Sequence, residues 1–420
     1  MLWDNETWAN APAPSRHTVT TSPKIAYLIP QFPGQTHIFF WRELQALENL
    51  GADVHVMSTT LPPPGLISHA WSDEAIQRTT FLATRSPIEM LSGLVKSRAL
   101  GLAGDVRREG ATLLKDIGVT AGAALRLARI ATELRLDHIH VHSCGRAALI
   151  ALLAHRMTGV PYSLTLHGPL QDYGAGQRAK WREAAFATVI TCKLIDEVQT
   201  SLADGLPDRL LLQPMGVDTE RLTRSTPYRP YDGNGPFRIF CVGRLNRVKG
   251  HQDLLAAVRQ LVDRGVEVAL EIAGEDDDGG HGFHRELQTE LDRLRLGPHA
   301  RLLGAISSDE VHRKLLEAHV FAAASWHEPL GVVYMEAMSS GVPVIGTAAG
   351  GVPELITEGE NGLLVPPKTP EALANALDRL RLDPGLATGL ATRGRAYAEA
   401  HCRSSIGAET LLREIALTDG

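Results

Sequence analysis

The sequence of residues 327–354 is HEPLGVVYMEAMSSGVPVIGTAAGGVPE, and no other stretch of the chain is as informative. It places two carboxylates, Glu328 and Glu336, on either side of a small-residue turn. An apolar segment of helix length, a strand-like run and a Gly-Gly turn follow. Turns that lead from a strand into a helix present backbone N–H groups to anionic ligands in α/β proteins. The stretch therefore predicts a ligand-binding unit of a parallel α/β fold.

The spacing of the two carboxylates indicates what they bind. If Leu330–Ser340 is helical, Glu328 and Glu336 are separated by a rise of about 12 Å. Paired carboxylates that act on one glycosidic bond lie about 5–10 Å apart. We therefore expect the two glutamates to hold opposite ends of an extended anion, and a nucleotide sugar fits this description. The amides of Gly331–Val333 at the helix start would favour its phosphates. The alternative is a capped helix with two surface glutamates.

Size and composition limit the possible classes of protein. A chain of 420 residues exceeds the usual size of one hydrophobic core, so two domains are expected. The hydrophobic content of 44% and the 39 glycines are typical of a soluble α/β protein. The net charge of −6 gives no electrostatic support to nucleic-acid binding.

The sequence also predicts a cytoplasmic location. The four cysteines have no metal-ligand spacing and are typical of reduced, mostly buried thiols. No apolar run has the length needed to cross a bilayer, and residues 1–23 lack the hydrophobic region of a signal peptide. We expect these residues to form a disordered N-terminal extension.

Short apolar runs alternate with helix-length segments throughout, which predicts parallel sheets. We expect strands at Lys24–Ile29, Ala52–Ser58, His138–His142, Tyr162–Leu166, Thr188–Cys192, Leu210–Gln213, Phe237–Val242, Val266–Ile272, Arg301–Leu303, Val320–Ala324, Val342–Thr347 and Gly362–Val365. One helix start is well marked, because Ser307 and Glu310 have capping-box spacing. The Pro- and Gly-rich segment Ser225–Pro236 interrupts the alternation and predicts a linker.

This pattern divides the chain into two doubly wound halves. Ligands are expected at the carboxyl ends of the strands, in a cleft between the halves. The predicted regions are the N-terminal extension 1–23, an N-terminal domain 24–215, a linker 216–236, a C-terminal domain 237–395 and a C-terminal helix 396–420.

Three further segments contribute to the predicted site. The loop Gly243–Gly250 follows a strand and carries Arg244 and Lys249, which together with helix N–H groups would bind a diphosphate. It matches neither the dinucleotide fingerprint nor the P-loop. His167 stands at the carboxyl end of a strand before a glycine, although an isolated histidine is more often structural. The loop that contains Gly34 follows the first strand, and its backbone is expected to approach a phosphate, although taken alone the loop is only a turn.

Two other features have alternative interpretations. Glu275–Asp278 is an acidic run of the kind that binds Mn²⁺ in some transferases, but its loop-like surroundings favour solvated charge, and we predict no metal. The histidines at positions 138, 140 and 142 share one face of a strand and are expected to be structural or close to the site. Residues 84–130 carry many cations among aliphatic residues. They are interpreted as amphipathic surface helices or, alternatively, as a contact with an anionic membrane or a lipid-linked acceptor.

These residues resemble a known family. The pair Glu328-x₇-Glu336, the segment Gly243-Arg244 with Lys249, and the segment 349–354 (AGGVPE) are similar to motifs of the retaining GT-B glycosyltransferases of sequence family 4. Further similarities are Asn361-Gly362-Leu363-Leu364, Ser163-x-Thr165-x-His167-Gly168 and Pro214-Met215-Gly216-Val217-Asp218. The resemblance covers roughly residues 24–402 and is denser in the second half. Thr36–Phe40 and Met215 depart from the family pattern, which leaves the acceptor undefined.

The resemblance implies a GT-B fold, with two Rossmann-like domains that face an interdomain cleft, and a nucleotide-diphosphate-sugar donor. Glu336 would bind the ribose, Arg244 and Lys249 the diphosphate, and Glu328 the sugar hydroxyls. His167 would lie beside the sugar. The rest of the implied donor site comprises Gly34, Gly243, Leu330, Gly331, Val332 and Val333. No cofactor is expected, and the C-terminal helix would cross back to the first domain.

The implied reaction is transfer of a sugar to a hydroxyl acceptor with retention of configuration, in surface polysaccharide or glycolipid assembly. A UDP-sugar is the favoured donor, with GDP-mannose next, and the acceptor is expected to be a carbohydrate or a lipid-linked molecule. The enzyme would work in the cytoplasm, with peripheral contact at the inner membrane face as an additional hypothesis. The alternatives are a nucleotide-sugar epimerase, a non-catalytic scaffold and, ranked low because aromatic residues are only 5% of the chain, a glycogen-type polymerase.

Overall fold

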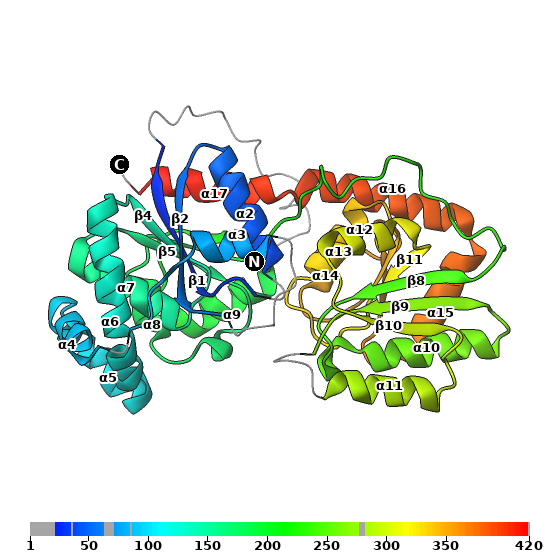
Figure 1. Cartoon of the computed structure of the whole chain (residues 1–420), viewed down its shortest axis with the longest axis horizontal. Helices are drawn as coiled ribbons and strands as arrows, with labels where there is room; N and C mark the ends of the chain where they lie inside the picture. The colour runs from blue at the N-terminus through cyan, green and yellow to red at the C-terminus, as the bar shows by residue number, and fades with distance from the viewer. Residues whose placement is uncertain (1–21, 35–36, 63–70, 85, 277–281, 419–420) are drawn as a thin grey trace. The chain divides into compact units, whose positions relative to one another are not determined.

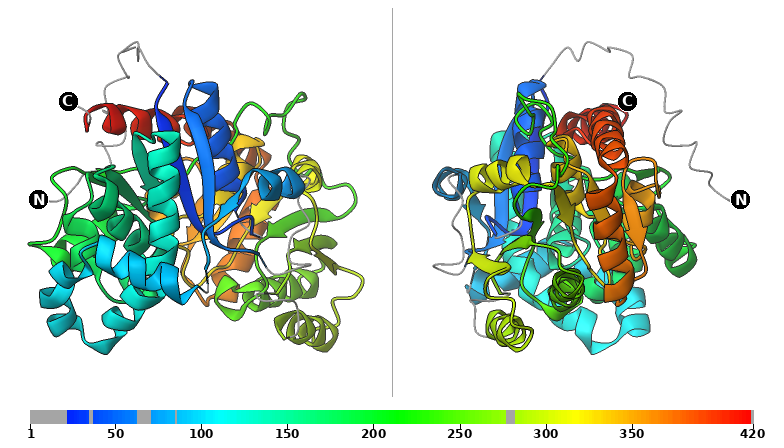
Figure 2. Two further views of the ribbon diagram at one scale, coloured as in Figure 1. Left: turned by 60° about the vertical axis from the view of Figure 1, so that its left-hand side comes forward. Right: turned by 90° about the vertical axis from the view of Figure 1, so that its right-hand side faces the viewer.

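Two fully parallel sheets organise the chain (Figure 1). The computed structural model describes residues 22–34, 37–62, 71–84, 86–276 and 282–418, so nearly all of the expected N-terminal extension lies outside the described residues. One unit comprises Gly216–Ser404, and the other is formed by the described residues that precede Gly216 together with the segment that begins at Ser405. Figure 2 shows each unit from two further directions.

The sheet of the N-terminal unit has the strand order β3-β2-β1-β4-β5-β6-β7. Its strands are β1 (Lys24–Gln31), β2 (Asp53–Thr60), β3 (Thr80–Phe81), β4 (His138–Val141), β5 (Tyr162–Leu166), β6 (Phe186–Val189) and β7 (Leu210–Leu212). The order reverses between β1 and β4, which makes this the point where doubly wound sheets bind ligands.

Helices cover this sheet, and α7 packs on β1, β4 and β5. The helices of the unit are α2 (Ile38–Asn49), α3 (Ser72–Arg78), α4 (Pro87–Lys96), α5 (Ala103–Glu109), α6 (Ala111–Leu134), α7 (Arg146–Thr158), α8 (Gln177–Arg182), α9 (Cys192–Leu202) and α17 (Ser404–Ala416). Eight consecutive residues of α7, from Ala147 to Ala154, are buried, as expected for a helix that covers the centre of a parallel sheet.

The sheet of the C-terminal unit has the order β10-β9-β8-β11-β12-β13 and reverses between β8 and β11. Its strands are β8 (Phe237–Val242), β9 (Val268–Ala273), β10 (Ala300–Gly304), β11 (Val320–Ala322), β12 (Val344–Thr347) and β13 (Leu363–Val365). Its helices are α10 (His251–Asp263), α11 (Phe283–Arg293), α12 (Ser308–Glu317), α13 (Val332–Ser339), α14 (Val352–Leu355), α15 (Pro370–Leu382) and α16 (Pro384–His401).

All twelve predicted strands are present in the predicted order. Tyr162–Leu166 and Phe237–Val242 have both ends as predicted, and the other ten are shifted at one or both ends. The largest shift concerns Thr188–Cys192, because β6 ends at Val189 and Cys192 already begins α9. The cause is Thr191, whose side chain accepts the Leu194 N–H at 3.4 Å and caps the helix. The sequence did not predict β3, which has only two residues. The Ser307 cap is confirmed by a 3.2 Å bond from the Glu310 N–H to the Ser307 hydroxyl.

The segment 216–236 packs on the C-terminal unit. The Val217 N–H donates to the Cys402 carbonyl at 2.7 Å, and the Tyr228 hydroxyl donates to the His319 carbonyl at 2.6 Å. The expected boundary between residues 395 and 396 falls inside α16, which is continuous to His401. Among the helices of the described ranges, none has the length and apolar character that a membrane span requires.

The last helix, α17, belongs to the N-terminal unit. Arg209, just before β7, donates to the Glu414 carboxylate at 3.0 Å, to the Glu414 carbonyl at 3.2 Å and to the Thr418 hydroxyl at 2.8 Å. Glu414 is buried, so these bonds compensate its desolvation and fix α17 beside the sheet edge.

Replacing Arg209 by Met should lower the stability of the N-terminal unit by about 2–3 kcal/mol, because Glu414 then stays buried with one cation fewer. Arg413→Met is the matched control. Arg413 contacts the same carboxylate at 3.1 Å, but its side chain is 51% exposed, so we expect a loss of about 0.5 kcal/mol. Urea unfolding and hydrogen exchange of the α17 amides measure both, and equal effects would contradict the anchoring role of Arg209.

Candidate functional site

The loops that follow β8 and β11 meet at the point where the C-terminal sheet reverses its order. The Trp326 N–H donates to the Val248 carbonyl at 2.7 Å and ties the two loops together. Gly250 has a φ of +66°, and a Cβ at this position would lie 1.9 Å from the Ala324 carbonyl oxygen. The backbones therefore pack at a distance that only glycine permits.

This packing brings Lys249 and Glu328 together. The Lys249 Nζ lies 2.5 Å from Glu328 Oε2, and the Ser325 hydroxyl is 3.3 Å from the same oxygen. The two charged side chains are largely buried, with exposed fractions of 18% and 12%. The sequence placed both residues in one site but did not predict this ion pair. A largely buried ion pair can be replaced by contacts with a ligand that carries both an anion and hydroxyl groups. Lys249 would then pair with the anion and Glu328 with the hydroxyls.

Gly331 precedes the first turn of α13 and has a φ of +90°. Val332 and Val333 follow it, and the N–H groups of a helix's first turn have no partner within the helix. Leu330 is buried beside this turn, and Glu336 lies one turn further along α13 and is partly buried. The helix start therefore places positive dipole ends directly after the Glu328 loop.

The start of the first loop is fixed by its neighbours. The Gly243 N–H donates to the Ala273 carbonyl at 3.0 Å, and the Arg244 carbonyl pairs with His251 Nε2 at 3.1 Å. The Arg244 side chain is exposed. The C-terminal unit thus contains the predicted residues Gly243, Arg244, Lys249, Glu328, Leu330, Gly331, Val332, Val333 and Glu336.

A third loop fixes the backbone of Glu328. The Gly351 N–H donates to the Glu328 carbonyl at 2.8 Å. Gly350 has a φ of +67°, and a Cβ there would lie 2.1 Å from the same carbonyl oxygen. The Gly-Gly turn of the sequence therefore serves to hold Glu328 in place.

The expectation of solvated charge is wrong for Asp276. This residue is buried, and its carboxylate accepts the Gly282 N–H at 3.0 Å and the His284 N–H at 2.7 Å. Both oxygens are occupied by backbone donors near the start of α11, which gives Asp276 a structural role. Asp277 and Asp278 lie outside the described residues.

The N-terminal unit contains a buried polar ladder between β4 and β5. The Ser163 hydroxyl lies between His138 Nε2 at 2.7 Å and His140 Nδ1 at 2.8 Å, and Thr165 Oγ1 lies 3.0 Å from His140 Nε2. Alternate residues of a strand lie on the same face of the sheet, so His138 and His140 of β4 meet Ser163 and Thr165 of β5 along the whole ladder. The interpretation of the histidines as structural or near-site residues agrees with this arrangement.

The ladder ends at His167, which is partly buried. The Nε2 of His167 lies 3.2 Å from His142 Nδ1, and His142 Nε2 lies 2.9 Å from Glu43 Oε2. The Tyr27 hydroxyl donates to the same Glu43 oxygen at 2.7 Å. The sequence analysis missed Glu43, although an acidic residue on the apolar stripe of α2, between Phe40 and Leu47, is a detectable signal.

These contacts favour one tautomer for each of the two rings. The contact between His142 Nε2 and Glu43 Oε2 is not aligned as a hydrogen bond, but a carboxylate oxygen at 2.9 Å favours a proton on Nε2. In neutral His142 the Nδ1 then accepts, and His167 donates its Nε2–H to it. Neutral His167 therefore presents Nδ1 as an acceptor.

Burial keeps these rings neutral. It lowers the pKa of His142 and of His167 to about 3, and it lowers the pKa of His140 well below the ordinary value. Burial also raises the pKa of the Glu43 carboxyl, which nearby His140 and the Tyr27 hydroxyl lower in part.

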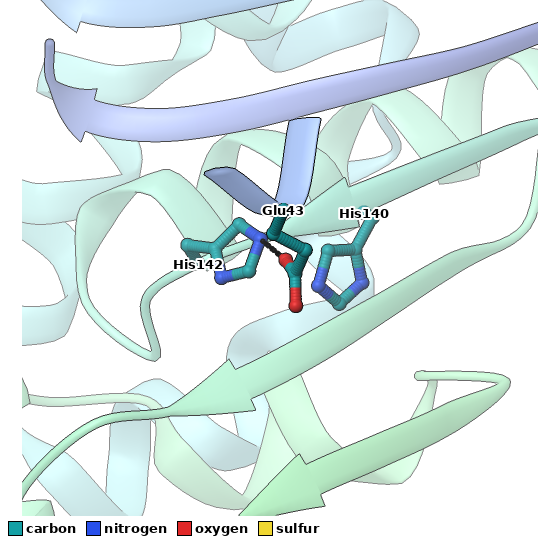
Figure 3. Close-up of side chains that lie close together, drawn as sticks. All are labelled: Glu43, His140 and His142. Carbon is teal, nitrogen blue, oxygen red and sulfur yellow. Dashed lines mark ion pairs between the residues drawn. The ribbon is translucent and has the colours of Figure 1, made fainter. Parts of the chain in front are cut away.

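Glu43, His140 and His142 offer ligand atoms that lie within 4.8 Å of one another (Figure 3). Both nitrogens of His140 already bond to hydroxyls of the ladder, and those of His142 face Glu43 and His167. A metal ion would have to displace these bonds. The donor set therefore fits a hydrogen-bonded network better than an ion site.

Gly34 lies in the loop after β1, in the same unit as His167. Its carbonyl accepts the His37 N–H at 3.1 Å, and a Cβ at this position would lie 2.6 Å from the His37 ring. The close packing explains a glycine here without a ligand. Gln35 and Thr36 lie outside the described residues.

Replacing Gly350 by Ala should destabilise the C-terminal unit by about 3 kcal/mol or more, because strain at positive φ adds to the clash with the Glu328 carbonyl. Gly359→Ala is the matched control, with a φ of +75° and no atom within 4 Å of the added Cβ. We expect it to cost about 1 kcal/mol. Urea unfolding separates the two, and equal losses would show that the contact with Glu328 is unimportant.

Protein labelled with nitrogen-15 histidine tests the tautomers. At about pH 5.5, where an ordinary histidine is mostly protonated, His142 and His167 should still give the neutral Nε2–H pattern, because their pKa values are about 3. Glu43→Leu removes the acceptor, so His142 and His167 should no longer give only the Nε2–H pattern. The signal that is lost in His167→Gln belongs to His167. A protonated ring in the unmodified protein at this pH would contradict the network.

Comparison with known proteins places the chain in a family. Residues 232–397 match the family model described as "Glycosyl transferases group 1", and residues 36–221 match "Glycosyltransferase Family 4". D-inositol 3-phosphate glycosyltransferase of Corynebacterium jeikeium is 34% identical over 198 residues, which are 45% of this chain and 46% of that one. The match thus spans about half of that curated relative.

Two other similarities extend over most of the chain. WcaL of Escherichia coli, which carries a provisional assignment to colanic acid biosynthesis, is 24% identical over 84% of this chain and 89% of its own length. The crystal structure of HepE of Anabaena in complex with UDP superposes with a TM-score of 0.73 at 18% identity, over 94% of this chain and all of HepE. The two parallel sheets and these matches show that the fold is GT-B and that the chain belongs to the family 4 (group 1) glycosyltransferases, which are enzymes of EC class 2.4.

Proposed function

We propose that this protein transfers a sugar from a nucleotide-diphosphate donor to a hydroxyl acceptor with retention of anomeric configuration. The observation that carries the proposal is the contact between Lys249 Nζ and Glu328 Oε2 at 2.5 Å, next to the start of α13. It concentrates a cation, a carboxylate and the N-terminal end of a helix at the switch point of a doubly wound sheet, as binding of a phosphorylated sugar requires.

Each predicted residue has a role in this proposal. The donor diphosphate attracts Lys249 and Arg244 and accepts hydrogen bonds from the amides of the α13 first turn. When Lys249 turns to the diphosphate, Glu328 accepts hydrogen bonds from the hydroxyl groups of the sugar. Glu336 accepts hydrogen bonds from the ribose hydroxyl groups. Gly243 and Leu330 are assigned to the border of the donor, where the missing side chain of Gly243 would let the ligand approach.

The reaction breaks the bond between the anomeric carbon and the diphosphate oxygen, and the electron pair leaves with the diphosphate. Lys249, Arg244 and the helix amides stabilise the charge that develops there. The acceptor hydroxyl attacks from the same face, and its proton passes to the departing phosphate oxygen. No protein base is needed for this balance.

His167 and Gly34 belong to the N-terminal unit, and in the proposal they border the sugar. The Nδ1 acceptor of His167 suits a sugar hydroxyl, and the Glu43–His142 pair positions the ring. The proposed acceptor is a carbohydrate or a lipid-linked molecule in surface polysaccharide or glycolipid assembly, which the likeness to WcaL supports. A UDP-sugar is favoured, with GDP-mannose next. The four free cysteines fit a cytoplasmic site of action.

The donor can be identified in two steps. Thermal-shift measurements with UDP, GDP, ADP and TDP give the base, and proton NMR of the anomeric signal then follows the matching nucleotide sugars with simple glycoside acceptors. Retention of configuration in the product supports the proposal. Conversion of the nucleotide sugar without any acceptor would favour an epimerase, and no stabilisation by any nucleotide would favour a non-catalytic scaffold.

Lys249→Ala should reduce kcat/KM by about 10²–10³, the loss typical of one group that stabilises developing charge. Lys314→Ala is the matched control, because Lys314 also forms a largely buried ion pair in this unit, with Glu271 at 2.7 Å, but away from the loops after β8 and β11. We expect its rate to change less than about twofold. Glu336→Ala should lower the activity through nucleotide binding. Unchanged turnover in Lys249→Ala would refute the assignment.

A further inference from the structure

Helix α4 is apolar on two opposite faces, although only one of them is covered. On the inner face, a Cβ at Gly93 would lie 2.0 Å from the Ala121 carbonyl oxygen, so the backbone of α4 lies directly against α6. On the outer face, Ile88, Leu91 and Val95 are exposed by 78%, 65% and 71%. Their spacing puts these three side chains in one row along the helix.

This row is unusual for the molecule. Ile88 and Val95 have the largest exposed fractions of any large aliphatic side chain among the residues that the structure describes. A scattered exposed leucine needs no explanation, but a contiguous aliphatic row on a helix that already has a packed side does.

The basic and acidic side chains of this region differ in their exposure to solvent. Lys96, Arg107 and Arg108 are exposed on α4 and on α5, and both helices contact η1 (Ala99–Leu102) and α6. Figure 1 shows α4 and α5 at one end of the N-terminal unit.

The acidic residues of the same region are turned inward. Glu89 pairs with Arg126 at 3.1 Å and Arg129 at 3.3 Å, and buried Asp105 pairs with Arg182 at 3.3 Å. Buried Asp116 pairs with Arg146 at 2.8 Å, and Glu109 accepts the Gly176 N–H. The outer surface is therefore basic, although the whole chain has a net charge of −6.

We propose that Ile88, Leu91, Val95, Lys96, Arg107 and Arg108, here called the α4 surface, dock on an anionic lipid bilayer. An aliphatic row, with exposed cations on its own helix and on the next helix, matches the boundary between anionic headgroups and acyl chains, and it gains from both apolar burial and charge. A second copy of the chain fits less well, because a symmetric contact would bring the same cations face to face.

The inference goes beyond sugar transfer and does not depend on it. It names the surface on which the protein would meet a lipid-linked acceptor. Binding to vesicles requires neither donor nor acceptor, so this proposal and the proposed function can fail separately.

The test is flotation of the full chain with vesicles of phosphatidylglycerol and phosphatidylcholine at a ratio of about 1:2, and with phosphatidylcholine alone. We expect binding to the anionic vesicles at about 0.05 M salt and much weaker binding at about 0.5 M salt. Leu91→Gln should reduce binding at least about fivefold, since it removes one of three inserted side chains. Glutamine is a good helix former, so α4 should persist.

Leu382→Gln is the matched control, because Leu382 at the end of α15 is exposed by the same 65%. We expect it to bind vesicles like the unmodified protein. A combined Lys96→Gln and Arg107→Gln variant should lose the preference for anionic vesicles. Unchanged melting temperatures show that the variants are folded.

Three results would overturn the proposal. The first is no vesicle binding at low salt. The second is binding that Leu91→Gln and Leu382→Gln reduce equally, because the α4 surface would then have no special role. The third is a dimer in light scattering that Leu91→Gln dissociates, which would assign the row to a second copy of the chain.

Discussion

Glu328 is the residue on which the loops of the C-terminal unit converge. Its carboxylate meets Lys249 from the loop after β8, and its carbonyl accepts the Gly351 N–H from the loop after β12. Both contacts require backbones to approach to a distance that a Cβ would prevent, which Gly250 and Gly350 allow. The small residues of the stretch 327–354 are therefore constrained by packing, and the orientation of the carboxylate is a consequence of that packing.

The sequence predicts most of the fold because parallel strands are buried on both faces and appear as short apolar runs. Phe237–Val242 is predicted with both ends correct, whereas the run at Thr188–Cys192 is displaced because Thr191 caps a helix inside it. The sequence also predicts that Lys249 and Glu328 lie in loops at strand ends. It does not predict that they touch, because contact across 79 positions depends on β8 and β11 being neighbours in the sheet.

Two acidic residues show why the local sequence pattern is not sufficient to predict the role of a carboxylate. Asp276 belongs to an acidic run typical of solvent, yet backbone donors surround it in a buried position. Glu43 is an acidic residue among the buried apolar side chains of α2, and it contacts Tyr27 of β1 and His142, which follows β4. In each case the partners come from segments that the sequence does not connect, so the role of the carboxylate follows from the fold.

The proposed reaction gives different electrostatic roles to the two units. The C-terminal unit offers full charges and helix dipoles, which suit a leaving diphosphate that gains negative charge. The sugar carbon gains positive character in the same step, as in other reactions that pass through an oxocarbenium-like transition state. A protonated imidazole beside that carbon would repel it. Burial lowers the pKa of His167 to about 3, so the ring that is proposed to face the sugar orients a hydroxyl through neutral Nδ1 without adding a positive charge.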